Sequence, residues 1–215
     1  SINMEKIETT IKEKENQPAP APTACRRCGS LAAPKFITLL GWRQQDHCDT
    51  CGAIIAEERE KREMEEHRKM TIETYLARSG IVRGILAQMT LENFNPQLAG
   101  KAYDIAKEYA EGFGRETTSG LMLYGKAGSG KTHLAVAIAR HIIEQKQIQV
   151  RFARVVDLLA EIRKTFNENE QYRTENESDL IQRYASAPLL IIDDLGAEKT
   201  TDWVRQILYQ IIDER

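Results

Sequence analysis

The chain has 215 residues, of which 41% are hydrophobic and 29% are charged, and its formal net charge is −2. This length suits one large domain or two smaller ones, and the near-neutral charge does not indicate a protein that coats nucleic acid. No apolar run approaches the roughly 18 residues that span a bilayer, and the polar start lacks the apolar segment of a secretory signal. We therefore expect a cytoplasmic protein with no membrane contact. In that reducing compartment, clustered cysteines bind metal more often than they form disulfides.

Two segments are typical of connections between folded parts. The first 24 residues are polar and end in QPAPAPTA, and alternating Pro and Ala favour an extended, solvated backbone, so residues 1–24 are predicted to be a flexible tether. Residues 56–90 are predicted to be a charged helical linker. Glu, Lys and Arg alternate there at spacings that allow opposite charges to pair four residues apart, and Gly80 is the expected helix stop.

All four cysteines lie between these connections, in two Cys-x-x-Cys pairs separated by 19 residues. This spacing is typical of a four-thiolate zinc site made by Cys25, Cys28, Cys48 and Cys51. Such a site has no open position, which favours a structural role over a catalytic one. His47 could replace one thiolate, and an iron–sulfur cluster or a redox dithiol are further alternatives.

The apolar and β-branched residues between the two pairs predict a small hairpin. Residues 25–55 are therefore predicted to form a zinc-binding module whose metal supplies much of its folding energy, since so short a segment buries little apolar surface.

From residue 119 onward, strand-like apolar runs alternate with helical patterns, after a further helix at 101–113. Such alternation is typical of the α/β class, with a parallel sheet flanked by helices. The expected strands cover 120–125, 148–155 and 187–196, and the expected helices cover 130–146, 156–166 and 201–215.

GKAGSGKT, residues 125–132, matches the phosphate-loop pattern G-x-x-x-x-G-K-[ST] in full, with an apolar run before it and a helical pattern after it. Glycines let the backbone approach phosphates, and successive N–H groups at a helix start bind anions. We expect Lys131 to reach the β- and γ-phosphates and the Thr132 hydroxyl to bind Mg²⁺. The predicted nucleotide contacts are Gly125, Lys126, Ala127, Gly128, Ser129, Gly130, Lys131 and Thr132.

Two carboxylates follow the buried run 189–192, at the sheet edge where ligands of open α/β sheets bind. We expect Asp193 to hold Mg²⁺ and Asp194 to polarise the attacking water, so that Lys131, Asp193 and Asp194 are the candidate catalytic residues. The alternative is a solvated turn with no chemical role.

LMLYGKAGSGKTHLAVAIA together with LLIIDDLGAE resembles the AAA+ ATPases of the DnaC/DnaI helicase-loader group and the related IstB transposition helpers. The resemblance covers residues 79–215 and implies a P-loop AAA+ domain, here residues 91–215, that binds ATP or ADP with Mg²⁺. It adds His133 to the cofactor-binding residues. It also makes Leu91 and Phe94 candidates for contact with the base, with core packing as the alternative for Phe94.

The predicted zinc module helps to identify the expected binding partner. The DnaI-like subgroup, which this chain resembles, has a similar N-terminal zinc-bearing domain that binds the replicative helicase. The resemblance therefore implies ATP-dependent loading of a hexameric replicative helicase onto single-stranded DNA. It also implies self-association and contact with an initiator protein. An IstB-like ATPase helper of DNA transposition is the alternative, and a non-hydrolysing, nucleotide-gated adaptor is a third hypothesis.

The polar stretch at 163–187 matches the region where the helicase-loader group has a DNA-contacting insertion. Its cations and rings suit single-stranded DNA, but five acidic residues lie among them and favour a solvated loop. The DNA-contact candidates are Arg163, Lys164, Phe166, Tyr172, Arg173 and Arg183.

The family's sheet has five strands, whereas three are expected here, and its later sensor residues have no counterpart before Arg215. We therefore expect that the natural chain continues beyond Arg215. If it does not, ATP hydrolysis should be weak or absent.

Overall fold

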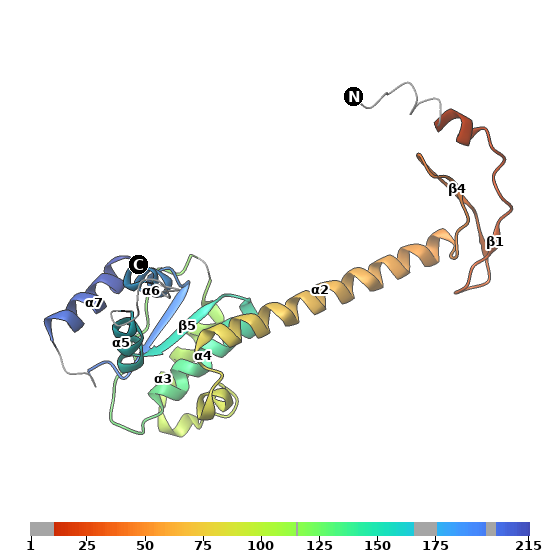
Figure 1. Ribbon diagram of the computed structural model, residues 1–215. Helices are drawn as coiled ribbons and strands as arrows, with labels where there is room; N and C mark the ends of the chain where they lie inside the picture. Colours follow the sequence, from red (N-terminus) through yellow and green to blue (C-terminus); the bar gives the residue numbers. More distant parts are fainter. Residues whose placement is uncertain (1–10, 115, 166–175, 197–200) are drawn as a thin grey trace. The chain divides into compact units, whose positions relative to one another are not determined.

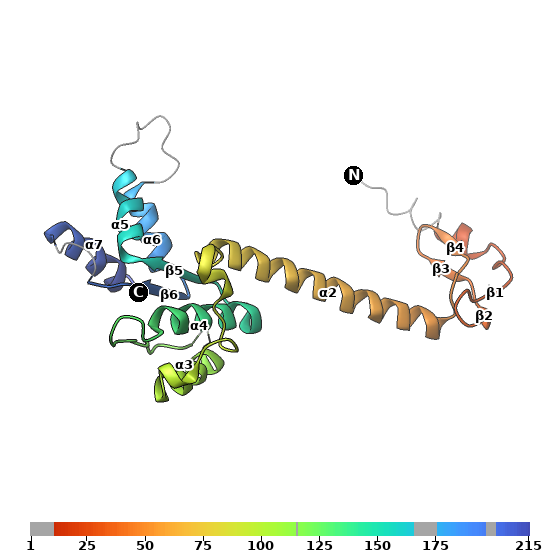
Figure 2. The ribbon, with the colours of Figure 1, turned by 90° about the horizontal axis from the view of Figure 1, so that it is seen from below.

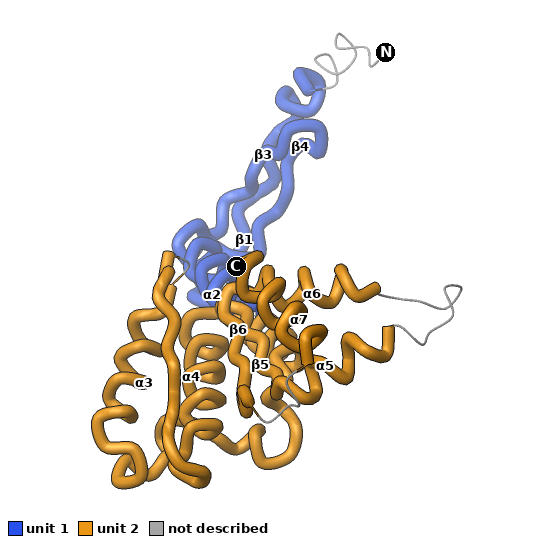
Figure 3. The backbone as a smooth tube through the Cα atoms, turned by 90° about the vertical axis from the view of Figure 1, so that its left-hand side faces the viewer, with its two compact units in different colours: residues 1–67 blue, residues 68–215 orange. Residues whose placement is uncertain are grey.

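The computed structural model describes residues 11–114, 116–165, 176–196 and 201–215. Contacts within the chain separate it into two units, Ser1–His67 and Arg68–Arg215, which Figure 3 draws in different colours. Among the described helices, none combines the length and the apolar character that a membrane crossing requires.

The first unit contains two antiparallel strand pairs (Figures 1 and 2). The second pair is the hairpin that the sequence predicts between the cysteine pairs, and Phe36 faces Trp42 across it with their rings in edge contact at 5.6 Å. The pairs are β1 (Thr23–Ala24) with β2 (Leu31–Ala32), and β3 (Lys35–Ile37) with β4 (Gly41–Arg43).

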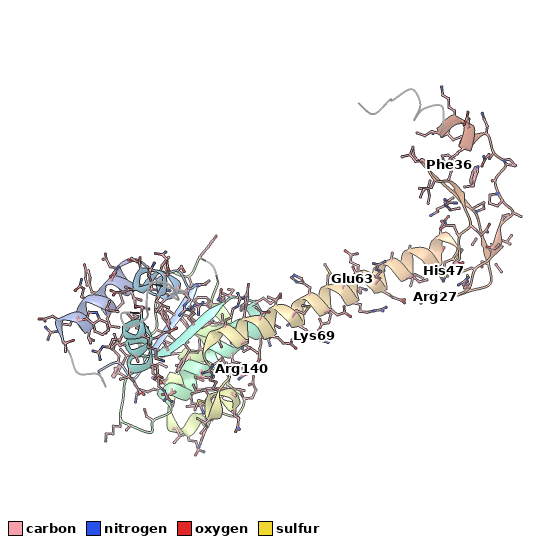
Figure 4. All side chains as sticks on the ribbon, viewed as in Figure 1. Arg27, Phe36, His47, Glu63, Lys69 and Arg140 are labelled. Atoms are coloured by element: carbon pink, nitrogen blue, oxygen red, sulfur yellow. The ribbon has the colours of Figure 1, made fainter. Side chains whose placement is uncertain are left out.

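Helix α2 (Asp49–Ser79) is the charged helix that the sequence predicts, but it begins seven residues before the predicted start at 56. Its first turn therefore contains Cys51, and Cys48 directly precedes the helix. Ion pairs at four-residue spacing, Arg59–Glu63 and Glu57–Lys61, have N–O distances of 2.7 Å each on its exposed surface, and Figure 4 labels Glu63. The helix ends where predicted, since Gly80 follows it with a φ of +87°.

The second unit is an α/β sandwich, as predicted (Figures 1 and 2). Its two strands are parallel, and Phe152 lies opposite Ile191 in their register. Helices α3 and α4 cover one face of the sheet, and α5, α6 and α7 cover the other. The elements are α3 (Lys101–Gly112), α4 (Lys131–Lys146), β5 (Val150–Arg154), α5 (Val155–Lys164), α6 (Glu177–Ala185), β6 (Leu189–Asp193) and α7 (Asp202–Asp213), with short 3₁₀ helices η1 (Gly84–Gln88) and η2 (Pro96–Leu98) before α3.

Both strands divide their side chains between two hydrophobic clusters. Val150 and Phe152 of β5 pack with α3 and α4, whereas Ala153 packs with the helices of the other face. Strand β6 alternates in the same way, since Leu189 and Ile191 pack on the first cluster and Leu190 and Ile192 on the second. Because successive strand residues point to opposite faces, a strand covered on both sides reads as a continuous apolar run.

The predicted strand at 120–125 is wrong. This segment pairs with no strand in the described parts of the chain, where the parallel sheet consists of β5 and β6. Leu121 and Leu123 pack partly against the α3–α4 core, whereas Met122 and Tyr124 are 78% and 86% exposed. The apolar pattern in the sequence indicates only that one side of the segment is buried. A β-strand also needs a neighbouring strand that forms hydrogen bonds with its N–H and C=O groups.

The end of α2 lies directly against the sheet through Gly80. A Cβ atom at this position would lie 2.5 Å from the Phe152 carbonyl oxygen, and the next residue, Ile81, is completely buried. Only glycine satisfies both the left-handed φ and the close approach of the two backbones.

We predict that Gly80→Ala lowers the free energy of unfolding of the second unit by about 3 kcal/mol, because strain at positive φ and overpacking add. Gly84→Ala is the matched control: Gly84 has a φ of +57° but no atom within 4 Å of its Cβ position, so we expect a loss of about 1 kcal/mol. Urea unfolding followed by Trp203 fluorescence in a Trp42→Phe background measures both. Equal losses would show that the contact with Phe152 is not important.

Candidate functional site

The phosphate loop adopts the backbone conformations that its glycines permit. Gly125, Gly128 and Gly130 have φ values of +150°, +76° and +86°, which side chains disfavour. Gly130 is the N-cap of α4 and no side chain caps the helix there. The first N–H groups of α4 are therefore available to an anion, which the helix dipole also favours.

Lys131 is folded back onto this loop. Its Nζ donates hydrogen bonds to the carbonyl oxygens of Gly125 at 3.0 Å and Lys126 at 2.9 Å. These bonds place an ammonium group beside the uncapped start of α4, so both the charge and the backbone donors favour a phosphate group at this position.

Thr132 and Asp193 meet although 61 residues separate them in the sequence. The Thr132 hydroxyl donates to the Asp193 carboxylate, with distances of 2.9 Å to Oδ2 and 3.2 Å to Oδ1. The hydroxyl comes from the first turn of α4 and the carboxylate from the end of β6. Hydroxyl and carboxylate oxygens are the ligands that Mg²⁺ prefers, so the pair has the donor set to hold this ion beside a bound phosphate.

Asp194 differs from its neighbour, because it is exposed and has a φ of +56°. Asp tolerates this left-handed conformation better than most residues do. The structure thus places one carboxylate against Thr132 and leaves the next facing solvent, where it can accept a hydrogen bond from water.

The segment that precedes α3 lies against the phosphate loop. Leu91 and Phe94 are both buried members of the α3–α4 core. A Cβ atom on Gly130 would lie 2.7 Å from Cε2 of Phe94, so this ring packs directly on the loop. The core-packing alternative for Phe94 is thus confirmed, and a base contact by either residue stays a prediction.

His133 faces protein groups through its Nε2 atom, which lies 3.0 Å from both the Thr90 carbonyl oxygen and Asn93 Oδ1. Sequence reasoning missed the role of Asn93 and Thr90. Their three-residue spacing was the available signal, because Ser or Thr followed by a polar residue at that distance often closes a turn reciprocally.

A cleft of about 420 Å³ adjoins the loop, between α3 and residues 121–125. Ser129 and Lys131 are among the residues that line it, and the other lining residues are mainly apolar. Its size is within the range of sites for small molecules.

The four cysteines of the first unit form a second candidate site. Their sulfur atoms all lie within 4.8 Å of one another, and those of Cys28 and Cys48 are 3.7 Å apart. This agrees with the edge of a sulfur tetrahedron around zinc, about 3.8 Å for a Zn–S distance of about 2.3 Å. It is far longer than a disulfide bond of about 2.05 Å. His47 lies next to the cluster in sequence but does not belong to it, so the residues present fit a four-thiolate centre.

The pKa values of these thiols show how the four sulfur atoms affect one another's ionisation. Burial opposes ionisation of Cys25, but N–H groups of Cys48, Cys28 and Arg27 outweigh it and lower the pKa of this thiol to about 6. The neighbouring sulfur of Cys28, followed by burial, raises the pKa of Cys51 to about 12. The sulfur atoms thus oppose full ionisation of the group, and a positive ion between them would relieve their repulsion.

The two cysteine turns are built differently. Gly29 has a φ of +77° and its N–H donates to the Cys25 carbonyl at 2.9 Å, as expected for a knuckle. Gly52, which follows the second pair, lies inside α2, and its N–H donates to the Cys48 carbonyl as part of the helix. The second pair is therefore held by the helix instead of a knuckle.

A bidentate ion pair joins the first knuckle to α2. Arg27 and Glu58 meet through two hydrogen bonds of 2.9 and 3.1 Å, and Figure 4 labels Arg27 at this end of the helix. The Arg27 hydrogen bonds lower the pKa of the Glu58 carboxyl, although both groups are exposed and the stabilisation is therefore modest.

The nucleotide site and the cysteine centre can be compared with known proteins. The family model of IstB-like ATP binding proteins matches residues 36–215. The chain belongs to this family. It is therefore an ATP-binding protein of the AAA+ class, and the matched residues include the whole phosphate loop, Asp193 and the second cysteine pair.

Relatives of this chain include proteins named replicative helicase loader DnaC. The one from Buchnera aphidicola subsp. Baizongia pistaciae is 31% identical over 187 residues, which is 85% of this chain and 70% of the relative. The protein of Escherichia coli strain K12 is 29% identical over the same shares. A crystal structure of the DnaC helicase loader matches 60% of this chain and 70% of that chain with a TM-score of 0.52 and 28% identity.

We predict that the protein purifies with one zinc ion per chain. Cys28→Ser should lower the zinc content at least about tenfold, because the ion loses one of its four bonds to sulfur. His47→Ala is the control and should retain zinc. Metal analysis by mass spectrometry measures both. Loss of zinc from the His47 variant would establish a Cys₃His site, and iron in place of zinc would contradict the zinc assignment.

Proposed function

We propose that this protein loads a hexameric replicative helicase onto single-stranded DNA in an ATP-dependent manner. The observation that carries the proposal is the Thr132–Asp193 pair on a complete phosphate loop, in a chain about 30% identical over most of its length to proteins named replicative helicase loaders. A cytoplasmic location goes with this proposal.

Within this proposal, the site positions and neutralises charge, which is most of what phosphoryl transfer requires. Residues 125–132 hold the phosphates of ATP or ADP, and Lys131 moves from the loop carbonyls to the β- and γ-phosphates. Thr132 and Asp193 hold Mg²⁺, which shields the phosphate charge. Asp194 accepts a hydrogen bond from the attacking water and orients it.

The zinc module has the helicase as its partner in this proposal. A separate partner for the module is supported by the separation of the two sites. The cysteine centre lies in the first unit and shares no residue with the nucleotide site. Exposed apolar side chains at the β3–β4 turn, Leu39 and Leu40, offer surface for such a contact.

The proposal also includes contact with single-stranded DNA. Arg163 lies over the Trp203 ring at 4.6 Å and Arg183 pairs with Glu161, so both have partners within the second unit. Lys164 ends α5 and is exposed. The remaining candidates, Phe166, Tyr172 and Arg173, lie outside the described residues. We also propose self-association and contact with an initiator protein, on the family resemblance alone.

The second candidate function is that of an IstB-like ATPase helper of DNA transposition, which the matching family model favours by its description. The two functions share the nucleotide chemistry and differ in the captured partner. A non-hydrolysing, nucleotide-gated adaptor would share the binding step only.

We predict that Asp194→Asn lowers the rate of ATP hydrolysis about a hundredfold or more while the Kd for ATP changes less than about twofold, because the water is no longer polarised. Lys131→Ala should abolish ATP binding, and Asp157→Asn, an exposed carboxylate on α5, should resemble wild type. Phosphate release and calorimetric titration are the measurements. If the wild type binds ATP but releases no phosphate, it is the adaptor.

We predict that the wild type forms a stable complex with a bacterial hexameric replicative helicase and that Cys28→Ser loses it while ATP affinity stays unchanged. Size-exclusion chromatography with light scattering, with and without ATP, detects the complex. His47→Ala serves as the folded, zinc-retaining control. Capture of a transposase with no helicase binding would contradict the loader function and support the alternative.

A further inference from the structure

The turn before α3 is closed by its own side chains. The Thr90 N–H donates to Asn93 Oδ1 at 2.9 Å, and the Asn93 N–H donates to Thr90 Oγ1 at 3.2 Å. The Asn93 amide nitrogen donates to the Gln88 carbonyl. The bonds to Thr90 N–H and to Gln88 fix the orientation of the side-chain amide, so its oxygen is the atom that faces Thr90 N–H and His133.

His133 completes this arrangement from α4. Its Nε2 faces two acceptors, the Thr90 carbonyl oxygen and Asn93 Oδ1, each at 3.0 Å, so Nε2 must carry the hydrogen and donate to them. We call Thr90, Asn93 and His133 the lead-in clasp. In this clasp the Nε2–H group of His133 faces acceptors that belong to the protein.

Phe94 follows the clasp and is held on two sides. Its ring stacks on Tyr103 of α3 at 5.6 Å with an interplanar angle of 6°, and Tyr103 in turn donates a hydrogen bond to the Leu91 carbonyl at 3.3 Å. It meets the His133 ring edge-on at 5.1 Å. The ring also packs on Gly130, so it is a wedge between α3 and the last glycine of the phosphate loop.

A second attachment lies two turns further along α4. Arg140, labelled in Figure 4, donates to the carbonyl oxygens of Ala87 at 2.7 Å and Met89 at 3.3 Å. Helix α4 therefore holds this segment at two points, through His133 and through Arg140. His133 is the one next to the phosphate loop, so a change there displaces Phe94 most directly.

We propose that the lead-in clasp holds the phosphate loop in its anion-binding conformation by keeping Phe94 against Gly130, which makes His133 and Asn93 positioning residues. This rests on the nucleotide binding of the proposed function. His133 thus serves the phosphates through the loop backbone and makes no contact with the nucleoside. A preorganised site binds more tightly because no ordering is left for the ligand to induce.

The test compares two Mg²⁺-bound ligands, ATP and inorganic tripolyphosphate, which lacks the nucleoside. We expect His133→Ala and Asn93→Ala to raise both Kd values by the same factor, about three- to tenfold for one or two lost hydrogen bonds. His133→Gln, whose amide N–H can occupy the place of Nε2, should restore both Kd values to within about twofold. Phe94→Leu, which removes the wedge and keeps the clasp, should resemble His133→Ala.

His141→Ala is the matched control, because His141 lies on the same helix and outside the clasp, and it should bind both ligands as wild type does. A loss confined to ATP in His133→Ala would overturn the proposal and make the imidazole a nucleoside contact. Lower thermal stability with both Kd values unchanged would also overturn it, in favour of a purely structural role. Failure of the wild type to capture helicase would count against the loader function alone.

Discussion

The parallel pairing of β5 with β6 is the constraint on which the candidate nucleotide site depends. Its register places Asp193 opposite Arg154 at the carboxyl end of the sheet. Helix α4 packs on the same two strands and begins at the phosphate loop, so Thr132 reaches Asp193 across 61 positions of sequence. Motif residues far apart in the chain therefore meet because side chains of both strands bury themselves beneath α4.

The two units are stabilised in different ways. The second has two extensive hydrophobic clusters, one on each face of its sheet. The first buries few large side chains and holds four sulfurs within bonding range of one ion. For so small a module the metal takes the place of a core, which fits the general behaviour of short metal-binding domains. Chelators should accordingly act on the first unit and leave the second intact.

Local signals predicted the local structure well, namely the phosphate loop, the cysteine spacing, the hairpin, the charged helix and the alternation of strands with helices. Contacts between distant segments had no such signal. The apolar run at 120–125 resembled a strand because nothing in its composition reports a missing neighbour. Gly80 was expected only as a helix stop, because Phe152 is 72 positions away. The contact of His133 with Asn93 had no signal in the sequence either, because only the fold brings the two residues together.

The position of Cys51 in the first turn of α2 links metal coordination to helix nucleation. The middle of α2 is exposed and polar, so it gains little from packing, and starting a helix is the unfavourable step of its formation. A metal held by Cys48 and Cys51 would fix the backbone of that first turn before any propagation. The ion would thus act as a template for the helix as well as a clip between the cysteine pairs. Helical content measured by circular dichroism would then follow metal occupancy well beyond the residues that bind it.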